Sequence, residues 1–284
     1  MTRLAVLGSP IAHSQSPALH AAAYAVLGLD WRYDAVDVTG ATLAPFVAYR
    51  DDSWRGLSLT MPLKRDVLPL LQATDATADL TAAANTLLFD RADGGLTLRG
   101  FNTDVYGVTE AFRDAGVATL DRVQILGGGA TAASVLVAVR ALGATRALVS
   151  VRTPAKAADL AALGARIGVE VTVGPFDVDV DVDVDDDEAV PDAVVSTIPG
   201  HAAHGLAFAE RVRASSVLFD VAYDPWPSPL ALSWTDAGGT VLSGLEMLVH
   251  QALAQVRVFV NGAPDATLPG EADVLAAMRA AITR

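Results

Sequence analysis

Three consecutive glycines, Gly127 to Gly129, follow a buried apolar strand expected over 122–126 and precede a helix expected from about 131 to 142. A strand, a tight glycine turn and a helix form the repeating unit of parallel α/β sheets. The same alternation of short apolar runs and helical stretches continues on both sides of the turn. The sequence therefore predicts an α/β protein.

Two α/β domains are expected from this alternation. Residues 1–103 form the first and 104–241 the second, a doubly wound Rossmann-type domain, and 242–284 turn helical and stay so. In the first domain we expect a mainly parallel sheet with strands over 4–8, 32–38, 56–59, 84–90 and 95–99, and helices over 16–27, 42–50 and 64–82. In the rest we expect strands over 122–126, 146–151, 169–173, 192–196 and 217–221, and helices over 105–116, 131–142, 156–163, 245–259 and 271–282.

The charge and composition exclude several classes of protein. The chain of 284 residues carries a net charge of −13, which argues against nucleic acid as a general partner because phosphate binding needs a basic surface. It has no cysteine, no apolar run that would span a membrane and no secretory leader, so we expect a cytoplasmic protein with no membrane partner. Both a monomer and a homodimer stay open as oligomeric states. The acidic segment 177–188 alternates Asp and Val, which predicts a solvated edge strand running into an acidic loop, and no metal site is expected.

The glycine turn indicates a nucleotide site. Gly127, Gly128, Gly129, Ala130 and Thr131 would let the backbone and a helix N-terminus approach a pyrophosphate, although Ala132 stands where the usual motif has its last glycine. The alternative is a plain tight connection between strand and helix. The next strand ends without the acid that an NAD site places on the ribose, and is followed by Arg152 and Thr153. These residues favour NADP, because a guanidinium can bind a 2′-phosphate.

Lysine is rare, with only Lys64 and Lys156 against eighteen arginines. Lys64 begins a predicted helix, where a cation is electrostatically disfavoured and more readily gives up its proton. Unlike arginine, lysine can gain and lose a proton, so Lys64 is a candidate for general acid–base chemistry. The alternative is an ordinary exposed lysine.

Three further polar clusters follow predicted strands of the first domain, where α/β proteins bind ligands. Ser14 and Ser16 lie at a helix start and suit a carboxylate, or Ser16 caps the helix. Asn85 offers a neutral donor and acceptor for hydroxyl groups. Asp104 offers a carboxylate that would orient Lys64. Turn or cap chemistry is the alternative for both.

Taken together and in order, these motifs resemble the shikimate dehydrogenase family over nearly the whole chain. The matching segments are G-S-P-I-A-H-S-Q-S-P from Gly8, T-M-P-L-K from Thr60, A-N-T from Ala84, N-T-D from Asn102, the glycine turn, F-D-V-A-Y-D-P from Phe219 and G-L-E-M-L-V-H-Q from Gly244.

The resemblance implies an N-terminal substrate domain, an NADP domain and C-terminal helices that return to the first domain. It implies reversible reduction of 3-dehydroshikimate to shikimate by NADPH, in the chorismate pathway to aromatic amino acids. Lys64 and Asp104 would be the catalytic pair. The other implied roles are Ser14, Ser16 and Tyr223 for the carboxylate, Thr60, Asn85, Asp104 and Gln251 for ring hydroxyls, residues 127–133, Arg152 and Thr153 for NADP, and Gly244 and Met247 near the nicotinamide.

Two positions depart from the family pattern. Ser58 stands where the family usually has Asn, which loses an amide contact, and Val151 replaces the Asn of an N-R-T motif. Two alternative functions stay open, the first of them implied by the family resemblance. One is a quinate or shikimate dehydrogenase using NAD, although Ser16 and Arg152 favour shikimate with NADP. The other is a non-catalytic NADP-binding redox sensor, which the presence of Lys64 and Asp104 disfavours.

Overall fold

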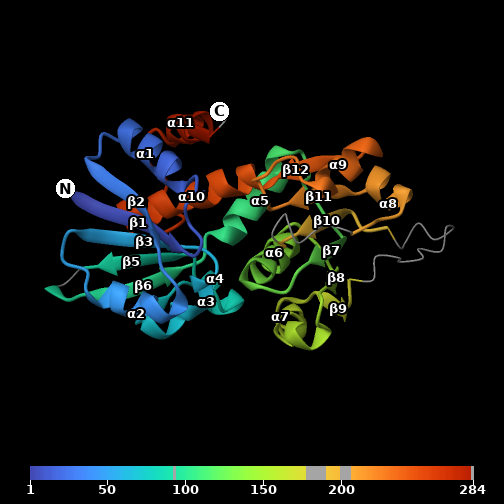
Figure 1. Cartoon of the computed structure of the whole chain (residues 1–284), viewed down its shortest axis with the longest axis horizontal. Coiled ribbons are helices and arrows are strands. Elements are labelled where there is room, and N and C mark those ends of the chain that lie inside the picture. The colour runs from blue at the N-terminus through green and yellow to red at the C-terminus, as the bar shows by residue number, and fades with distance from the viewer. Residues whose placement is uncertain (92–93, 177–189, 199–205, 283–284) are drawn as a thin grey trace. The chain divides into compact units, whose positions relative to one another are not determined.

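The computed structural model describes residues 1–91, 94–176, 190–198 and 206–282 (Figure 1). The chain forms two compact units, residues 1–107 with 248–284, and residues 108–247. Each unit contains one six-stranded sheet. The predicted acidic edge strand at 177–188 lies outside the described residues. Among the helices of the described ranges, none is long and apolar enough to cross a membrane.

The sheet of the first unit has the order β2-β1-β3-β5-β6-β4. β2 and β3 run parallel to β1, and β4 runs parallel to β6, whereas β5 is antiparallel to both β3 and β6. The prediction of a mainly parallel sheet is confirmed by the pairs of β1, β2, β3, β4 and β6, and β5 is the exception. The connection between β5 and β6 is too short for a crossover, so these two strands pair antiparallel. The strands are β1 (Thr2–Gly8), β2 (Trp31–Asp37), β3 (Trp54–Leu59), β4 (Ala73–Thr74), β5 (Thr86–Asp90) and β6 (Thr97–Phe101).

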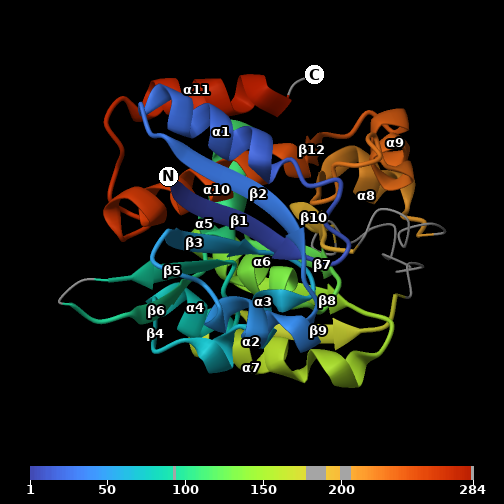
Figure 2. The ribbon, with the colours of Figure 1, turned by 60° about the vertical axis from the view of Figure 1, so that its left-hand side comes forward.

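Helices cover both faces of this sheet, which explains the continuous apolar run of β1. Because side chains alternate along a strand, Leu4 and Val6 join one core cluster while Ala5 and Leu7 join the other. Helices α1 and α11 lie side by side over the first cluster (Figure 2). The helices of this unit are α1 (Ser16–Val26), α2 (Gly40–Ala48), α3 (Leu63–Asp66), α4 (Ala76–Thr81), most of α10 (Gly244–Asn261), α11 (Glu271–Ile282) and the start of α5 (Asp104–Asp114).

The single helix predicted over 64–82 is wrong. The segment contains α3, a turn of 3-10 helix at Leu68–Leu70, strand β4 and then α4. Pro69 lacks the backbone N–H that a continuing helix needs, and Ala73 and Thr74 pair with β6 instead. The Asp75 carboxylate then accepts from Ala78 N at 2.7 Å and caps α4.

The second unit has a fully parallel sheet in the order β12-β11-β10-β7-β8-β9. This is the doubly wound order: from β7, successive strands of the chain are added first toward β9 and then, from β10, toward the opposite edge of the sheet. The five predicted strands are confirmed, whereas three short elements, α8, α9 and β12, were not predicted. The elements are β7 (Arg122–Leu126), α6 (Ala130–Ala141), β8 (Arg146–Ser150), α7 (Ala158–Ile167), β9 (Glu170–Gly174), β10 (Ala193–Ser196), α8 (Glu210–Ser215), β11 (Val217–Asp220), α9 (Pro229–Asp236) and β12 (Val241–Ser243).

Candidate functional site

Backbone hydrogen bonds bring the polar clusters of the first unit together. Thr60, directly after β3, donates its N–H to the Leu7 carbonyl of β1 at 2.9 Å. The Lys64 carbonyl accepts from Ala84 N at 2.8 Å, next to Asn85. Clusters separated by dozens of residues in the sequence thus meet at one edge of the sheet.

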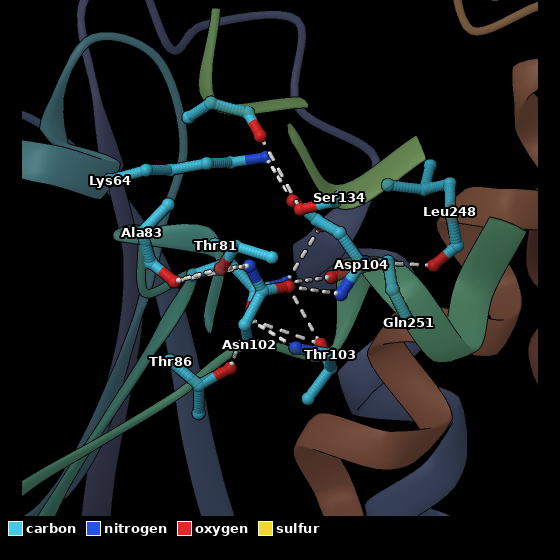
Figure 3. A network of polar contacts seen from close by, with 12 residues as sticks. Lys64, Thr81, Ala83, Thr86, Asn102, Thr103, Asp104, Ser134, Leu248 and Gln251 are labelled. Atoms are coloured by element: carbon cyan, nitrogen blue, oxygen red, sulfur yellow. Dashed lines mark hydrogen bonds and ion pairs between the residues drawn. The ribbon is translucent and has the colours of Figure 1, made fainter. Parts of the chain in front are cut away.

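Lys64 and Asp104 form a mostly buried ion pair at this edge. The Lys64 Nζ lies 2.6 Å from Asp104 Oδ2, and the two side chains are 13% and 4% exposed. Figure 3 shows the Lys64 side chain extended toward Asp104. A buried pair of this kind is stable only when its remaining polar atoms are also bonded, and Asn85 Nδ2 donates to the second carboxylate oxygen at 2.8 Å.

Asn85 is the centre of the surrounding network. Its Nδ2 group also donates to Gln251 Oε1 at 3.3 Å, and its Oδ1 accepts from Thr103 N at 2.9 Å. The backbone donor of Thr103 fixes which end of the Asn85 amide is oxygen, so the amide nitrogen faces Asp104 and Gln251. The structure therefore brings together four of the predicted site residues, Lys64, Asn85, Asp104 and Gln251.

Lys64 lies within α3, which is only four residues long, so a helix dipole gives little reason for a changed proton affinity; the Asp104 carboxylate is instead the charged group paired with Lys64. Asn102, the first residue of the N-T-D motif, has a structural role that was not predicted. Its Oδ1 accepts from Asp104 N at 3.0 Å and its Nδ2 donates to Thr81 Oγ1 at 2.8 Å, which holds the start of α5 in place.

Ser14 and Ser16 lie at the start of α1. Ser16 is not the cap, because the helix begins at Ser16 itself and Gln15 occupies the capping position without a side-chain bond. The Ser14 Oγ instead accepts from Ser16 N at 3.3 Å. The capping explanation is thus wrong, and the Ser16 hydroxyl is not used for helix capping.

The glycine turn of the second unit follows β7, at the point where the sheet order reverses. Gly127 has a φ of +111°, which an L side chain rarely adopts, and a Cβ there would overlap Thr197 Oγ1 at the end of β10. Gly129 is the N-cap of α6, and within the described ranges no heavy atom other than those of its own segment of the chain lies within 4 Å of the place its Cβ would occupy. Backbone N–H groups of Ala130 and Thr131 begin the helix beside this open space, which suits an anionic group.

Arg152 and Thr153 follow β8 and are both exposed. Val151, which stands where the family usually has Asn, is instead buried. A Cβ at Gly128 would lie 3.0 Å from the Val151 Cγ1. Val151 therefore packs against the glycine turn, whereas Arg152 is exposed beside it.

Tyr223 lies in the second unit, in the segment after β11. It is half-buried, and burial, with a contribution from Asp224, raises the pKa of its phenol. Asp220 holds this segment, since its carboxylate accepts from Ser228 Oγ at 2.6 Å and from Ala222 N at 3.2 Å. Burial raises the pKa of Asp220.

Gly244 and Met247 lie in the first turns of α10. A Cβ at Gly244 would overlap the Val221 carbonyl oxygen, so glycine is required there by the close approach of two backbones. Met247 is buried. The packing of Gly244 provides a structural reason for this residue beside the role implied by the family resemblance.

A second group of buried polar residues contacts the backbone of Asn85 and was not predicted. Gln255, one helical turn after Gln251, accepts from Ser58 Oγ at 2.7 Å and donates to the Asn85 carbonyl at 3.1 Å. His20 stacks on Tyr33 with ring centroids 3.9 Å apart, and burial lowers the pKa of His20 to about 3. The spacing of four between the two glutamines was the one sequence signal that placed them on the same helix face.

Comparison with known proteins agrees with this geometry. The family model described as the shikimate dehydrogenase substrate binding domain matches residues 6–87. The chain is 33% identical over 269 residues to shikimate dehydrogenase (NADP(+)) of Methanocella arvoryzae, covering 93% of this chain and 95% of that protein.

Two solved structures are also similar over nearly the whole chain. The crystal structure of Mycobacterium tuberculosis shikimate dehydrogenase aligns with a TM-score of 0.84 and 39% identity, covering 99% of this chain and all of that one. Shikimate 5-dehydrogenase from Thermus thermophilus in complex with NADP(H) and shikimate aligns with a TM-score of 0.76 and 29% identity, with 99% and 100% coverage.

Proposed function

Because the chain belongs to the shikimate dehydrogenase family, we propose that Lys64 and Asp104 are the catalytic pair of an NADP-dependent enzyme that interconverts 3-dehydroshikimate and shikimate. The observation that carries the assignment of these two residues is the 2.6 Å pair between Lys64 Nζ and Asp104 Oδ2, at a sheet edge with Asn85 and Gln251. A lysine held there by a carboxylate can pass a proton to a substrate oxygen.

In the reducing direction, Lys64 donates a proton to the alkoxide oxygen that forms at the ketone carbon. In the oxidising direction, the neutral amine accepts the hydroxyl proton. Asp104 orients the Lys64 ammonium group and accepts a hydrogen bond from a ring hydroxyl. When bound, NADPH would supply the hydride for reduction, and NADP⁺ would accept it in the oxidising direction.

The remaining polar residues of the first unit orient the substrate. Asn85, Gln251 and Thr60 bind ring hydroxyls, and the Ser14 and Ser16 hydroxyls bind the carboxylate. The family resemblance also implies a role for Tyr223 in binding the carboxylate. The buried, mutually bonded side chains around Asn85 support this assignment, because groups that are already oriented lose little entropy when the substrate binds.

The second unit fits NADP by its backbone and one arginine. The open space at Gly129, at the N-terminus of α6, would accommodate the pyrophosphate, and Gly128, Ala130 and Thr131 would donate backbone N–H groups. Exposed Arg152, with Thr153, would bind the 2′-phosphate. Gly127 allows the turn, and Gly244 and Met247 would lie toward the nicotinamide.

A steady-state assay with four pairs of substrate and cofactor tests the function. Oxidation of shikimate and of quinate is measured with NADP⁺ and with NAD⁺, and NADPH oxidation is followed with 3-dehydroshikimate. We expect the highest kcat/KM for shikimate with NADP⁺, and turnover of 3-dehydroshikimate by NADPH. Preference for quinate with NAD⁺, or binding of NADPH without any turnover, would overturn the proposal.

A further inference from the structure

Gln255 is a buried amide, 2% exposed, in the middle of α10. Each hydrogen-bonding position of its side chain is used. Oε1 accepts from Ser58 Oγ at 2.7 Å and lies 3.3 Å from His20 Nε2, while Nε2 donates to the Asn85 carbonyl and to Thr86 Oγ1, both at 3.1 Å. An amide with four bonds in a closed core has a single orientation.

The contacts around Gln255 also fix which way the hydrogens point. The Asn85 carbonyl can only accept, so the Gln255 nitrogen must face it and the Gln255 oxygen must face Ser58 and His20. His20 then carries its proton on Nε2, and its Nδ1 lies 3.0 Å from Tyr24 Oη, which donates. A neutral imidazole fits this arrangement, in accord with the low pKa that burial gives His20.

These bonds form one directed chain that ends at the catalytic pair. Tyr33 Oη donates to Ser58 Oγ at 2.6 Å, and Ser58 donates to Gln255. Gln255 donates to Thr86 Oγ1, which donates to Asn85 Oδ1 at 2.8 Å. Asn85 Nδ2 donates to Asp104 Oδ1, and the other oxygen of that carboxylate is paired with Lys64.

We propose that Gln255 is a positioning residue for the reaction, holding the Asn85 amide in the orientation that presents its nitrogen to Asp104 and to a substrate hydroxyl. The proposal rests on the proposed function. It also gives Ser58 a role of its own, although Ser58 lacks the amide of the Asn usual in the family, because the Ser58 hydroxyl bridges Tyr33 and Gln255.

A double-mutant cycle with Asn85 tests this role. Gln255→Met keeps the length of the side chain and removes its hydrogen bonds. We expect kcat/KM for shikimate to fall roughly tenfold, the equivalent of one buried hydrogen bond, mainly through KM for shikimate, with KM for NADP⁺ unchanged. In an Asn85→Ala background the same substitution should have almost no further effect, because Gln255 acts through Asn85.

The matched control is Val258→Ala, which removes buried volume from the same helix but none of these bonds. It should lower the free energy of unfolding while leaving kcat/KM within about twofold. The proposal would be overturned if the effects of Gln255→Met and Asn85→Ala on kcat/KM were additive. It would also be overturned if Val258→Ala, at the same free energy of unfolding as Gln255→Met, lost as much kcat/KM. Absence of shikimate turnover in the unmodified enzyme would instead overturn the function itself.

Ser58→Ala serves as the second variant where Gln255→Met does not fold. It removes one donor to Gln255 and leaves the His20 contact in place. We expect a two- to threefold rise in KM for shikimate that disappears in the Asn85→Ala background. An unchanged KM in Ser58→Ala would count against the positioning role.

Discussion

Around Asn85, the functional groups of the first unit are buried side chains bonded to one another, whereas the glycine turn of the second unit presents backbone and open space. Lys64, Asn85 and Asp104 come from three separate segments and are held by donors and acceptors with fixed directions. Gly127 and Gly129 contribute by lacking a side chain. The first arrangement is sensitive to the loss of an atom, and the second to the addition of one.

The largest effect is expected from Lys64→Ala, which removes the proton donor of the side-chain cluster. We expect kcat to fall about 10²- to 10⁴-fold, the usual contribution of general acid–base catalysis. Binding of NADPH, measured by fluorescence titration, should change little, because the proposed nucleotide contacts lie in the other unit. An unaltered kcat would show that Lys64 is not the proton donor.

Lys64→Arg separates proton transfer from charge. Arginine keeps the positive charge beside the buried Asp104 carboxylate but does not give up its proton. The variant should therefore retain more stability to urea than Lys64→Ala while losing a comparable share of kcat. Recovery of most of the activity in Lys64→Arg would assign Lys64 an electrostatic role only.

A smaller effect, on the cofactor alone, is expected from Arg152→Ala. Loss of a charge-assisted contact to the 2′-phosphate should raise KM for NADPH about 10- to 100-fold and leave KM for NADH unchanged. The matched control is Arg146→Ala, at the other end of β8, where the arginine is exposed and pairs with Asp121 at 3.0 Å. An equal rise in KM for both cofactors in Arg152→Ala would contradict the 2′-phosphate assignment.

The two regions also differ in how much the sequence predicted. The turn after β7 was predicted correctly because its strand, glycines and helix are consecutive, and local geometry determines them. The individual clusters at Lys64, Asn85 and Asp104 were predicted because each places polar residues directly after an apolar strand, where α/β proteins bind ligands.

Their mutual contacts were harder to predict, since pairing of β5 with β3 and β6 brings them together and that pairing is not local. The predicted helix over 64–82 failed for a related reason, because β4 gains hydrogen bonds from β6 that its own segment does not reveal. Gln255 was missed because its partners, Ser58 and Thr86, lie far away in the sequence.

The smallest effects are expected from two glycine substitutions that separate folding from cofactor binding within one turn. Gly127→Ala places a Cβ at a positive φ and against Thr197, so the free energy of unfolding should fall by roughly 2 kcal/mol. Gly129→Ala meets neither obstacle among the described residues and should change stability by less than about 1 kcal/mol. Its Cβ would instead occupy the space assigned to the pyrophosphate, which should raise the Kd for NADPH severalfold. Urea unfolding and NADPH titration of both variants measure the two quantities. Unchanged NADPH affinity in Gly129→Ala would mean that the turn is only a structural connection. Arg152 would then be the remaining candidate for binding the cofactor in this part of the second unit.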